Sequence, residues 1–272
     1  MPLIQFVSPK GGVGRTSLCV NLGVALGRLG YSVFLVDLDP QNALIRHFAL
    51  PGGGEHGLID YVDGFLSNEQ SWRHLSVPLE DMLSVVPFGS SLTLPQRQAS
   101  LASPGWLLPR LRSLEETSHT LVLVDTSVLH DATSAPLTQA ADLTLVTLMA
   151  DAGSLAILPQ WEAALGAPPP APWKAAHTDG RLGYLINQID SRSPLKREIA
   201  EMMLERFSPE LVGAIHRDEA MSEALADQRP VILQSPFSAA AHDIEQAARA
   251  VASRFPLYAS GGVTATDRQS AG

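Results

Sequence analysis

A glycine-rich stretch near the start of the chain, residues 8–17, follows an apolar run and opens a helical segment. Residues 3–7 predict a short buried strand, and residues 18–29 predict an amphipathic helix. A glycine-rich loop between a strand and a helix brings backbone N–H groups and the positive end of the helix dipole to one point. We therefore expect the loop to bind phosphate, although a glycine-rich loop considered alone also fits an ordinary turn.

The loop differs from the phosphate-loop pattern G-x-x-x-x-G-K-S/T at two positions. Pro9 stands at the first glycine position, and Arg15 stands at the lysine position. The glycines of the loop still supply a tight turn, and Thr16 stands where a Mg²⁺-bound hydroxyl belongs. The loop therefore retains the glycines of the cradle and the metal-binding hydroxyl, but it has an arginine where the pattern has a lysine.

Apolar runs of strand length alternate with helical segments along most of the chain. The pattern predicts strands over residues 3–7, 32–37, 82–87, 120–125, 143–149, 182–187 and 211–215. It predicts helices over residues 18–29, 100–116, 135–141, 152–165, 195–207, 219–226 and 239–255, with weaker helical pieces at 58–65 and 69–75. We therefore expect an α/β fold with a doubly wound, mostly parallel sheet and helices on both faces.

Two other segments set the expected boundaries of the fold. Residues 167–174 are rich in proline, so we expect an extended surface loop there. Residues 259–272 are small and polar, and we expect them to form a flexible tail. Because no linker divides the chain convincingly, residues 1–258 are expected to form a single domain.

The composition argues against several kinds of protein. A formal net charge of −9 and a pI near 5.3, with no run of basic residues, argue against a broad nucleic-acid surface. The single cysteine, Cys19, is expected to pack in the core, and the eight histidines show no metal-ligand spacing. The start of the chain lacks the basic region of a signal peptide, and no uninterrupted apolar run reaches the ~18 residues of a membrane span. We therefore expect a cytoplasmic protein without a direct membrane anchor.

Acidic residues at the ends of two predicted strands complete the set that a nucleoside triphosphate site needs. Asp125 ends the strand at 120–125, where a carboxylate would hold Mg²⁺, usually through a water. Asp39 follows the strand at 32–37 and could orient or deprotonate an attacking water. Ligands of open parallel sheets bind at the carboxyl ends of the strands, so both residues are expected near the phosphates. An acidic residue at a strand end is also a common cap, and only its combination with the loop favours a site.

The chain resembles the MinD/ParA group of deviant Walker A ATPases, a class of P-loop NTPases. The loop of that group reads K-G-G-x-G-K-S/T, and residues 10–16 match every position but one. Residues 37–42 and 123–126 resemble its two switch segments, and residues 213–218 resemble its I-P-x-D segment with His216 in place of proline. The resemblance spans nearly the whole chain, with the motifs in the order of the family. It implies a nucleotide-binding domain that uses ATP and Mg²⁺ as cofactors.

The resemblance also implies roles for individual residues in a homodimer that sandwiches two nucleotides. The residues that would bind the nucleotide are Lys10, Gly11, Gly12, Val13, Gly14, Arg15, Thr16, Ser17 and Asn187. Among them, Asn187 would read adenine. Thr16, Asp39 and Asp125 would hold Mg²⁺, with Asp125 acting through a water. Lys10 would reach across to the nucleotide of the partner, so that Lys10 and Asp39 would be the catalytic residues. A solvated surface lysine is the plain alternative for Lys10.

Arg15 is the departure that bears on activity. A guanidinium is larger than an ammonium and planar, so it is not a conservative replacement at a tightly fitted site, although it can contact phosphate bidentately. We therefore expect nucleotide binding to be weakened or reshaped. Hydrolysis of ATP to ADP and phosphate is expected to be slow or absent, which makes the chain a weak ATPase at most.

Within the group, the degenerate loop, the chain length and the lack of a DNA-binding extension at the start resemble the BcsQ branch, which is associated with bacterial cellulose synthesis. That branch implies a cytoplasmic accessory protein recruited to the inner membrane or cell pole, with the cellulose synthase complex or a small accessory subunit as its partner. Three alternatives stay open. A partition ATPase would need a basic surface for DNA. A division-site regulator would end in a basic amphipathic helix, which residues 261–268 do not resemble. A pseudo-ATPase scaffold would bind partners without turnover.

Overall fold

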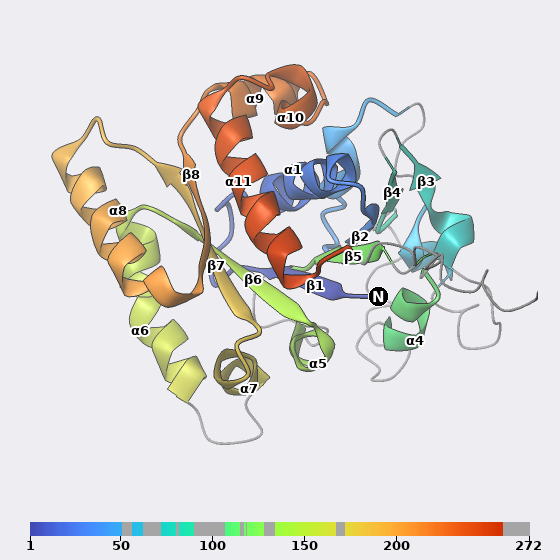
Figure 1. The fold of residues 1–272 in the computed structure, drawn as a ribbon, viewed down its shortest axis with the longest axis horizontal. Coiled ribbons are helices and arrows are strands. Elements are labelled where there is room, and N and C mark those ends of the chain that lie inside the picture. Colours follow the sequence, from blue (N-terminus) through green and yellow to red (C-terminus); the bar gives the residue numbers. More distant parts are fainter. Residues whose placement is uncertain are drawn as a thin grey trace, which may run out of the picture.

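The computed structural model describes residues 1–50, 56–61, 72–79, 82–89, 107–114, 117, 119–127, 134–166 and 172–257. Across these residues, eight strands form one sheet in the order β3-β4-β2-β5-β1-β6-β7-β8 (Figure 1). Every neighbouring pair is parallel except β3 and β4, which pair in the antiparallel sense. The predicted α/β class with a doubly wound, mostly parallel sheet is confirmed.

The strands are β1 (Leu3–Val7), β2 (Ser32–Asp37), β3 (Val77–Pro78), β4 (Leu83–Val86), β5 (Thr120–Asp125), β6 (Leu143–Met149), β7 (Leu182–Ile189) and β8 (Leu211–His216). β1, β2 and β5 begin and end where the sequence predicts, because both faces of each strand are buried and this leaves an unbroken apolar run. β7 runs past its predicted end through an irregularity in its pairing with β8, where Gln188 takes a φ of 57°. β3 is too short for a sequence pattern to predict.

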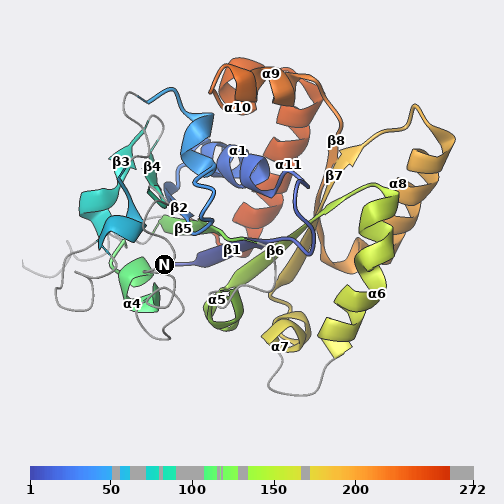
Figure 2. The same cartoon turned by 180° about the vertical axis from the view of Figure 1, so that it is seen from behind.

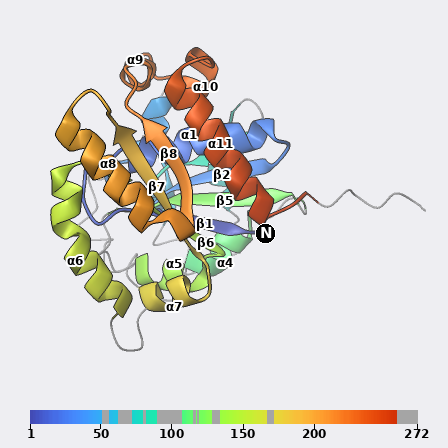
Figure 3. The ribbon, with the colours of Figure 1, turned by 60° about the vertical axis from the view of Figure 1, so that its left-hand side comes forward.

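The helices are α1 (Arg15–Arg28), α4 (Leu107–Arg112), α5 (Ser134–Ala140), α6 (Ala152–Gly166), α7 (Pro172–Thr178), α8 (Pro194–Arg206), α9 (Ala220–Ala226), α10 (Val231–Gln234) and α11 (Ala239–Arg254). Short 3₁₀ turns are η1 (Leu44–His47), η2 (Leu58–Tyr61), η3 (Trp72–Leu75) and η5 (Ser208–Glu210). α1 and α11 lie on one face of the sheet, and α4, α5 and α7 lie on the other (Figures 1 and 2). α6 and α8 pack beside β7 and share its apolar cluster (Figure 3). Helices therefore cover both faces of the sheet, as predicted.

The first helix is more deeply buried than the sequence predicts. An amphipathic helix is expected over residues 18–29, but every residue of α1 from Leu18 to Gly27 is buried. The reason is that α1 packs against both the sheet and α11 in one apolar cluster. Cys19 lies in this buried segment, which confirms the prediction that it packs in the core.

The prediction of an extended loop over residues 167–174 is wrong for residues 172–174, which open α7. Proline lacks an N–H, but the first turn of a helix does not need one, so Pro172 can begin a helix. Residues 167–171 lie outside the described residues.

Several other predicted segments fall partly or wholly outside the described residues. The described part of residues 100–116 contains α4, and the described parts of 58–65 and 69–75 form the turns η2 and η3. The expected tail, residues 259–272, lies outside the described residues altogether. Among the helices that the structure describes, none combines the length and the apolar character needed to cross a bilayer.

The order of the strands brings three loops to one edge of the sheet. β2, β5 and β1 are neighbours, and their carboxyl ends point the same way because the three strands are parallel. In the register of the sheet, Asp37 lies opposite Asp125, and Asp125 lies opposite Phe6. The segments that follow these strands therefore meet where open α/β sheets bind ligands.

Candidate functional site

The loop between β1 and α1 has the backbone shape of an anion cradle. Gly12 and Gly14 take φ values of 72° and 83°, in the left-handed region that favours glycine. Open space surrounds Gly11 and Gly12, so nothing lies within 4 Å of a Cβ added at either position. The amides of all three glycines donate no hydrogen bond to any residue that the structure describes. These donors lie at the N-terminus of α1, where the helix dipole also favours an anion.

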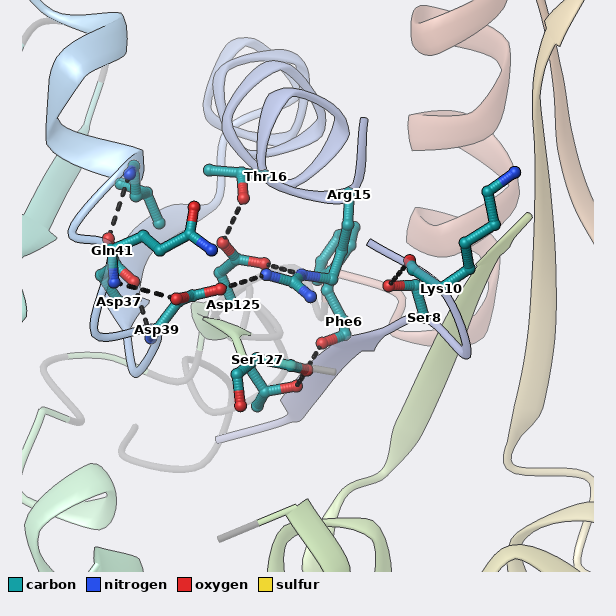
Figure 4. Close-up of polar contacts among 12 residues, drawn as sticks. Phe6, Ser8, Lys10, Arg15, Thr16, Asp37, Asp39, Gln41, Asp125 and Ser127 are labelled. Atoms are coloured by element: carbon teal, nitrogen blue, oxygen red, sulfur yellow. Dashed lines mark hydrogen bonds and ion pairs between the residues drawn. The ribbon is translucent and has the colours of Figure 1, made fainter. Parts of the chain in front are cut away.

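Arg15, the first residue of α1, is held by two carboxylates (Figure 4). Its Nε donates to Asp125 Oδ1 at 2.5 Å, and its Nη2 donates to Asp39 Oδ2 at 2.8 Å. All three residues are buried, with exposed fractions of 8% for Arg15, 0% for Asp125 and 8% for Asp39. Burial acts to lower the pKa of Arg15, but the two carboxylates outweigh it and raise the pKa, so the guanidinium stays charged. One cation thus joins the ends of β2 and β5.

The remaining oxygens of this cluster are also hydrogen-bonded. Thr16 Oγ1 donates to Asp125 Oδ2 at 2.6 Å, and the amide of Gln41 donates to Asp39 Oδ1 at 2.9 Å. Asp37, which is fully buried, accepts from the amides of Asp39 and Leu44 and so shapes the turn after β2. Burial and the charge of Asp125 raise the pKa of Asp37 well above its usual range. Burial also raises the pKa of Asp125, although Arg15 and Thr16 act to lower it.

Asn187 connects the end of β7 to the loop. Its Nδ2 donates to the carbonyl of Val13 at 2.8 Å, and its Oδ1 accepts from the amide of Gln188 at 2.9 Å. A cavity of about 310 Å³ lies beside the loop, and its lining includes Gly14, Ser17, Asn187, Gln188, His216 and Asp218. A larger cavity of about 460 Å³ lies elsewhere and includes no residue predicted for the site. The smaller cavity is therefore the one that continues from the glycine cradle, and the adenine-reading role of Asn187 stays a prediction.

Comparison with known proteins assigns the chain to a family. A family model described as "Cellulose biosynthesis protein BcsQ" matches residues 1–251. The chain belongs to the BcsQ family. The matched range of this BcsQ-family chain contains the glycine loop, both acidic strand ends and Asn187, and so includes every residue predicted for the site.

Individual relatives and a solved structure agree with this assignment. The BcsQ protein of Salmonella typhi is 27% identical over 251 residues, which cover 90% of this chain and 91% of that protein. The chromosome-partitioning ATPase Soj of Thermus thermophilus is 27% identical over 269 residues, which cover 92% of this chain and 95% of that protein. The crystal structure of a ParA family ATPase from Chlorobium tepidum matches with a TM-score of 0.72 and 18% identity, over 91% of this chain and 97% of that one. The predicted resemblance to the MinD/ParA group and its BcsQ branch is confirmed.

Magnesium does not fit the carboxylates of this BcsQ-family chain as they are arranged. The structure brings the three predicted ligands Thr16, Asp39 and Asp125 together, but Arg15 takes one oxygen of each carboxylate. A dication and the guanidinium would compete for the same two carboxylates, because both are cations that bind carboxylate oxygens. Mg²⁺ would therefore have to compete with Arg15 for these carboxylates.

Lys10 lies apart from this cluster, and its side chain points away from Arg15 (Figure 4). Its Nζ donates to Asp151 at 2.8 Å to Oδ2 and 3.1 Å to Oδ1. Asp151 follows β6 and also accepts from the amide of Ser154, in the first turn of α6. Burial acts to raise the pKa of Asp151, but Lys10 and Ser154 outweigh it and hold the pKa below its usual value. With 31% of its side chain exposed, Lys10 is a paired lysine at the rim of the loop.

His47 is a site residue that the sequence does not single out, because no motif marks it. It lies in η1 and is buried, and its Nε2 is 3.0 Å from the Oγ of Ser17. Its Nδ1 faces the carbonyl of Ala43 at 3.3 Å. A neutral ring that donates from Nδ1 and accepts at Nε2 satisfies both contacts. Burial lowers the pKa of His47, so its neutral form links the turn after β2 to the glycine loop.

The buried His47 predicts a pH dependence of stability. Its folded pKa is below the unfolded value of about 6.5, so its contribution is fully present above that pH and is lost as the pH falls below it. Wild type is expected to lose up to about 1.4 kcal/mol more per pH unit than His47→Gln between about pH 6.5 and 5.5. Urea unfolding at several pH values measures this difference. His242→Gln, at an exposed histidine, should follow wild type. Equal slopes for wild type and His47→Gln would contradict the assignment.

Proposed function

We propose that this BcsQ-family chain is an ATP-binding, dimeric switch protein that assists the assembly or polar localisation of a bacterial cellulose synthase complex. The observation that carries the proposal is the open glycine cradle, whose amides lie at the start of α1 and beside the cavity of about 310 Å³. The curated BcsQ relative supports the cellulose role through its name. The relatives named ATPases support ATP as the ligand.

In this proposal the triphosphate lies against the loop and the nucleoside lies in the adjoining cavity. Within the described residues the amides of Gly11, Gly12 and Gly14 have no acceptor, so they are available to phosphate oxygens, and the helix dipole of α1 adds to them. The cavity extends from Gly14 to Asp218, which gives the nucleoside a place next to the phosphates. Asn187 would then contact the base with the second hydrogen of its Nδ2, because the first is donated to the carbonyl of Val13.

We propose that the protein hydrolyses ATP slowly or not at all. Asp39 could act on an attacking water only if its carboxylate were free, but Arg15 and Gln41 occupy its two oxygens. A nucleotide-binding scaffold without turnover is therefore a second candidate function, and the contacts of Arg15 favour it. The formal net charge of −9 counts against the partition alternative, which needs a DNA-binding surface. We place the protein in the cytoplasm, recruited to the inner membrane or pole by a partner subunit.

Lys10 is proposed to act across the dimer. Its distance from the Arg15 cluster and its partial exposure leave it able to exchange Asp151 for the nucleotide of a second copy. Wild type is expected to sediment as a dimer with a non-hydrolysable ATP analogue and as a monomer without it, whereas Lys10→Ala should stay monomeric in both. Lys174→Ala, at an exposed lysine of α7, is the control. Dimerisation of Lys10→Ala to the extent of wild type would exclude the trans role.

The cellulose role can be tested in the bacterium that carries the gene. Deletion of the gene is expected to abolish or reduce cellulose, measured by dye binding, and the wild-type gene should restore it. Copurification of the cellulose synthase subunits with the tagged chain would identify the partner. A wild-type amount of cellulose in the deletion strain would contradict this function and would favour the partition and division-site alternatives.

A further inference from the structure

Arg15, next to the phosphate cradle in the chain, has hydrogen-bond donors that its two carboxylate partners do not use. A guanidinium has five N–H groups. The contacts with Asp125 and Asp39 use the Nε–H and one Nη2–H, and the other three donate to no residue within the described part of the chain. Arg15 directly follows Gly14, the last glycine of the cradle, and is the first residue of α1. The cation therefore binds carboxylates with one edge and remains able to bind an anion with another.

The Arg15 guanidinium also lies against two of the residues predicted to hold a metal, Asp39 and Asp125. Figure 4 shows it beside Asp125, with Thr16 on the other side of the same carboxylate. Arg15 joins two of the three groups that would hold a divalent cation, Asp39 and Asp125, and Thr16 is linked to them through its own hydrogen bond to Asp125. A free dication would have to compete with this charge, because one oxygen of each carboxylate is already engaged by Arg15.

We propose that Arg15 replaces the divalent cation of this site, so that the chain binds a nucleoside triphosphate without a metal ion. This inference rests on the proposed nucleotide site. In it, the guanidinium stays on Asp39 and Asp125, offsets one of their two negative charges, and donates its remaining N–H groups to the outer phosphate oxygens. The planar fork of arginine suits this double contact, because it presents donors in several directions from one rigid group.

Lysine at the same position would behave differently. An ammonium is a compact point charge, and it cannot hold two carboxylates and a phosphate through a planar fork. Arg15→Lys would therefore release at least one carboxylate of the Asp39 and Asp125 pair for a hard cation, whose preferred ligands are oxygens. A single substitution is expected to turn a metal-independent site into a metal-dependent one.

Binding of a non-hydrolysable ATP analogue, measured by calorimetry in excess Mg²⁺ and in excess EDTA, tests the inference. The Kd of wild type is expected to agree within about twofold between the two buffers, whereas Arg15→Lys should bind at least about tenfold more tightly with Mg²⁺. Arg249→Lys, at an exposed arginine of α11, is the matched control and should behave as wild type. A wild-type Kd about tenfold weaker in EDTA would overturn the inference while leaving the nucleotide site in place.

A second measurement uses Mn²⁺ alone and does not depend on nucleotide. Electron paramagnetic resonance should detect no tightly bound Mn²⁺ on wild type and a bound ion on Arg15→Lys, with circular dichroism to verify that the variant is folded. Mn²⁺ bound tightly to wild type would overturn the role of Arg15. Failure of every variant to bind nucleotide in either buffer would reject the proposed function, and with it metal-free nucleotide binding, whatever the Mn²⁺ result.

Discussion

Replacement of Arg15 by alanine is expected to destabilise the fold by about 3–5 kcal/mol, the usual cost of removing one partner from a buried ion pair. The substitution would leave Asp125 and Asp39 facing each other without a cation, and Asp125 is fully buried. Desolvated like charges repel strongly, so the native state would have to take up a proton or open the turn after β2 to admit water. Chemical denaturation monitored by circular dichroism measures the change in the free energy of unfolding.

Two further variants separate charge from packing at this position. Arg15→Met keeps much of the side-chain volume but removes the charge, so it should be destabilised nearly as much as Arg15→Ala. Arg249→Ala removes an exposed arginine whose partner is Glu245, and it should change stability by less than about 1 kcal/mol. If Arg15→Ala were as stable as Arg249→Ala, the ion cluster described here would not form in solution.

Replacement of Gly14 by alanine is expected to have the second large effect, on nucleotide binding. A Cβ at this position would lie 2.4 Å from Asn187 Nδ2. Asn187 cannot move aside freely, because its side chain is hydrogen-bonded to the carbonyl of Val13 and the amide of Gln188. The loop would therefore shift, and each lost hydrogen bond to a charged phosphate is worth about 1.5–3 kcal/mol, or about 10- to 150-fold in Kd. Calorimetry with the ATP analogue measures this loss.

A glycine outside the site controls for backbone strain. Gly14 has a φ of 83° and Gly180 a φ of 69°, so alanine is strained at both positions by about 1–2 kcal/mol. A Cβ at Gly180 meets nothing within 4 Å, and Gly180 lies after α7, outside the loop and its cavity. Gly180→Ala should therefore lose stability but keep the wild-type Kd. Equal Kd values for the two variants would show that nucleotide does not bind at this loop.

The sequence predicts the boundaries of a strand well where both faces of the strand are buried. β1, β2 and β5 lie inside the sheet with both faces covered, so their apolar runs mark both ends of each strand. The same reasoning fails at the margins. β3 consists of two residues, and α7 opens on a proline that also fits an extended loop. The character of α1 is mispredicted because its burial depends on α11, which follows more than two hundred residues later.

The sequence also predicts which residues gather at the site, but not how they pair. Thr16, Asp39 and Asp125 can be placed together because the carboxyl ends of parallel strands share an edge. Arg15 could pair with a phosphate or with a carboxylate. Which of the two it contacts depends on side-chain geometry, which cannot be predicted from the spacing of residues in the sequence. The Lys10 pair is similar, since Asp151 is 141 positions away and belongs to no motif of the loop.

A crystal structure of the protein grown with a non-hydrolysable ATP analogue and Mn²⁺ tests the replacement of the metal by Arg15 most directly. Anomalous scattering locates Mn²⁺ without ambiguity. The expected result is a triphosphate on the amides of Gly11, Gly12 and Gly14, Arg15 still paired with Asp125, and no anomalous peak beside Thr16. An anomalous peak between Thr16 and Asp125, with Arg15 displaced from both carboxylates, would contradict the account.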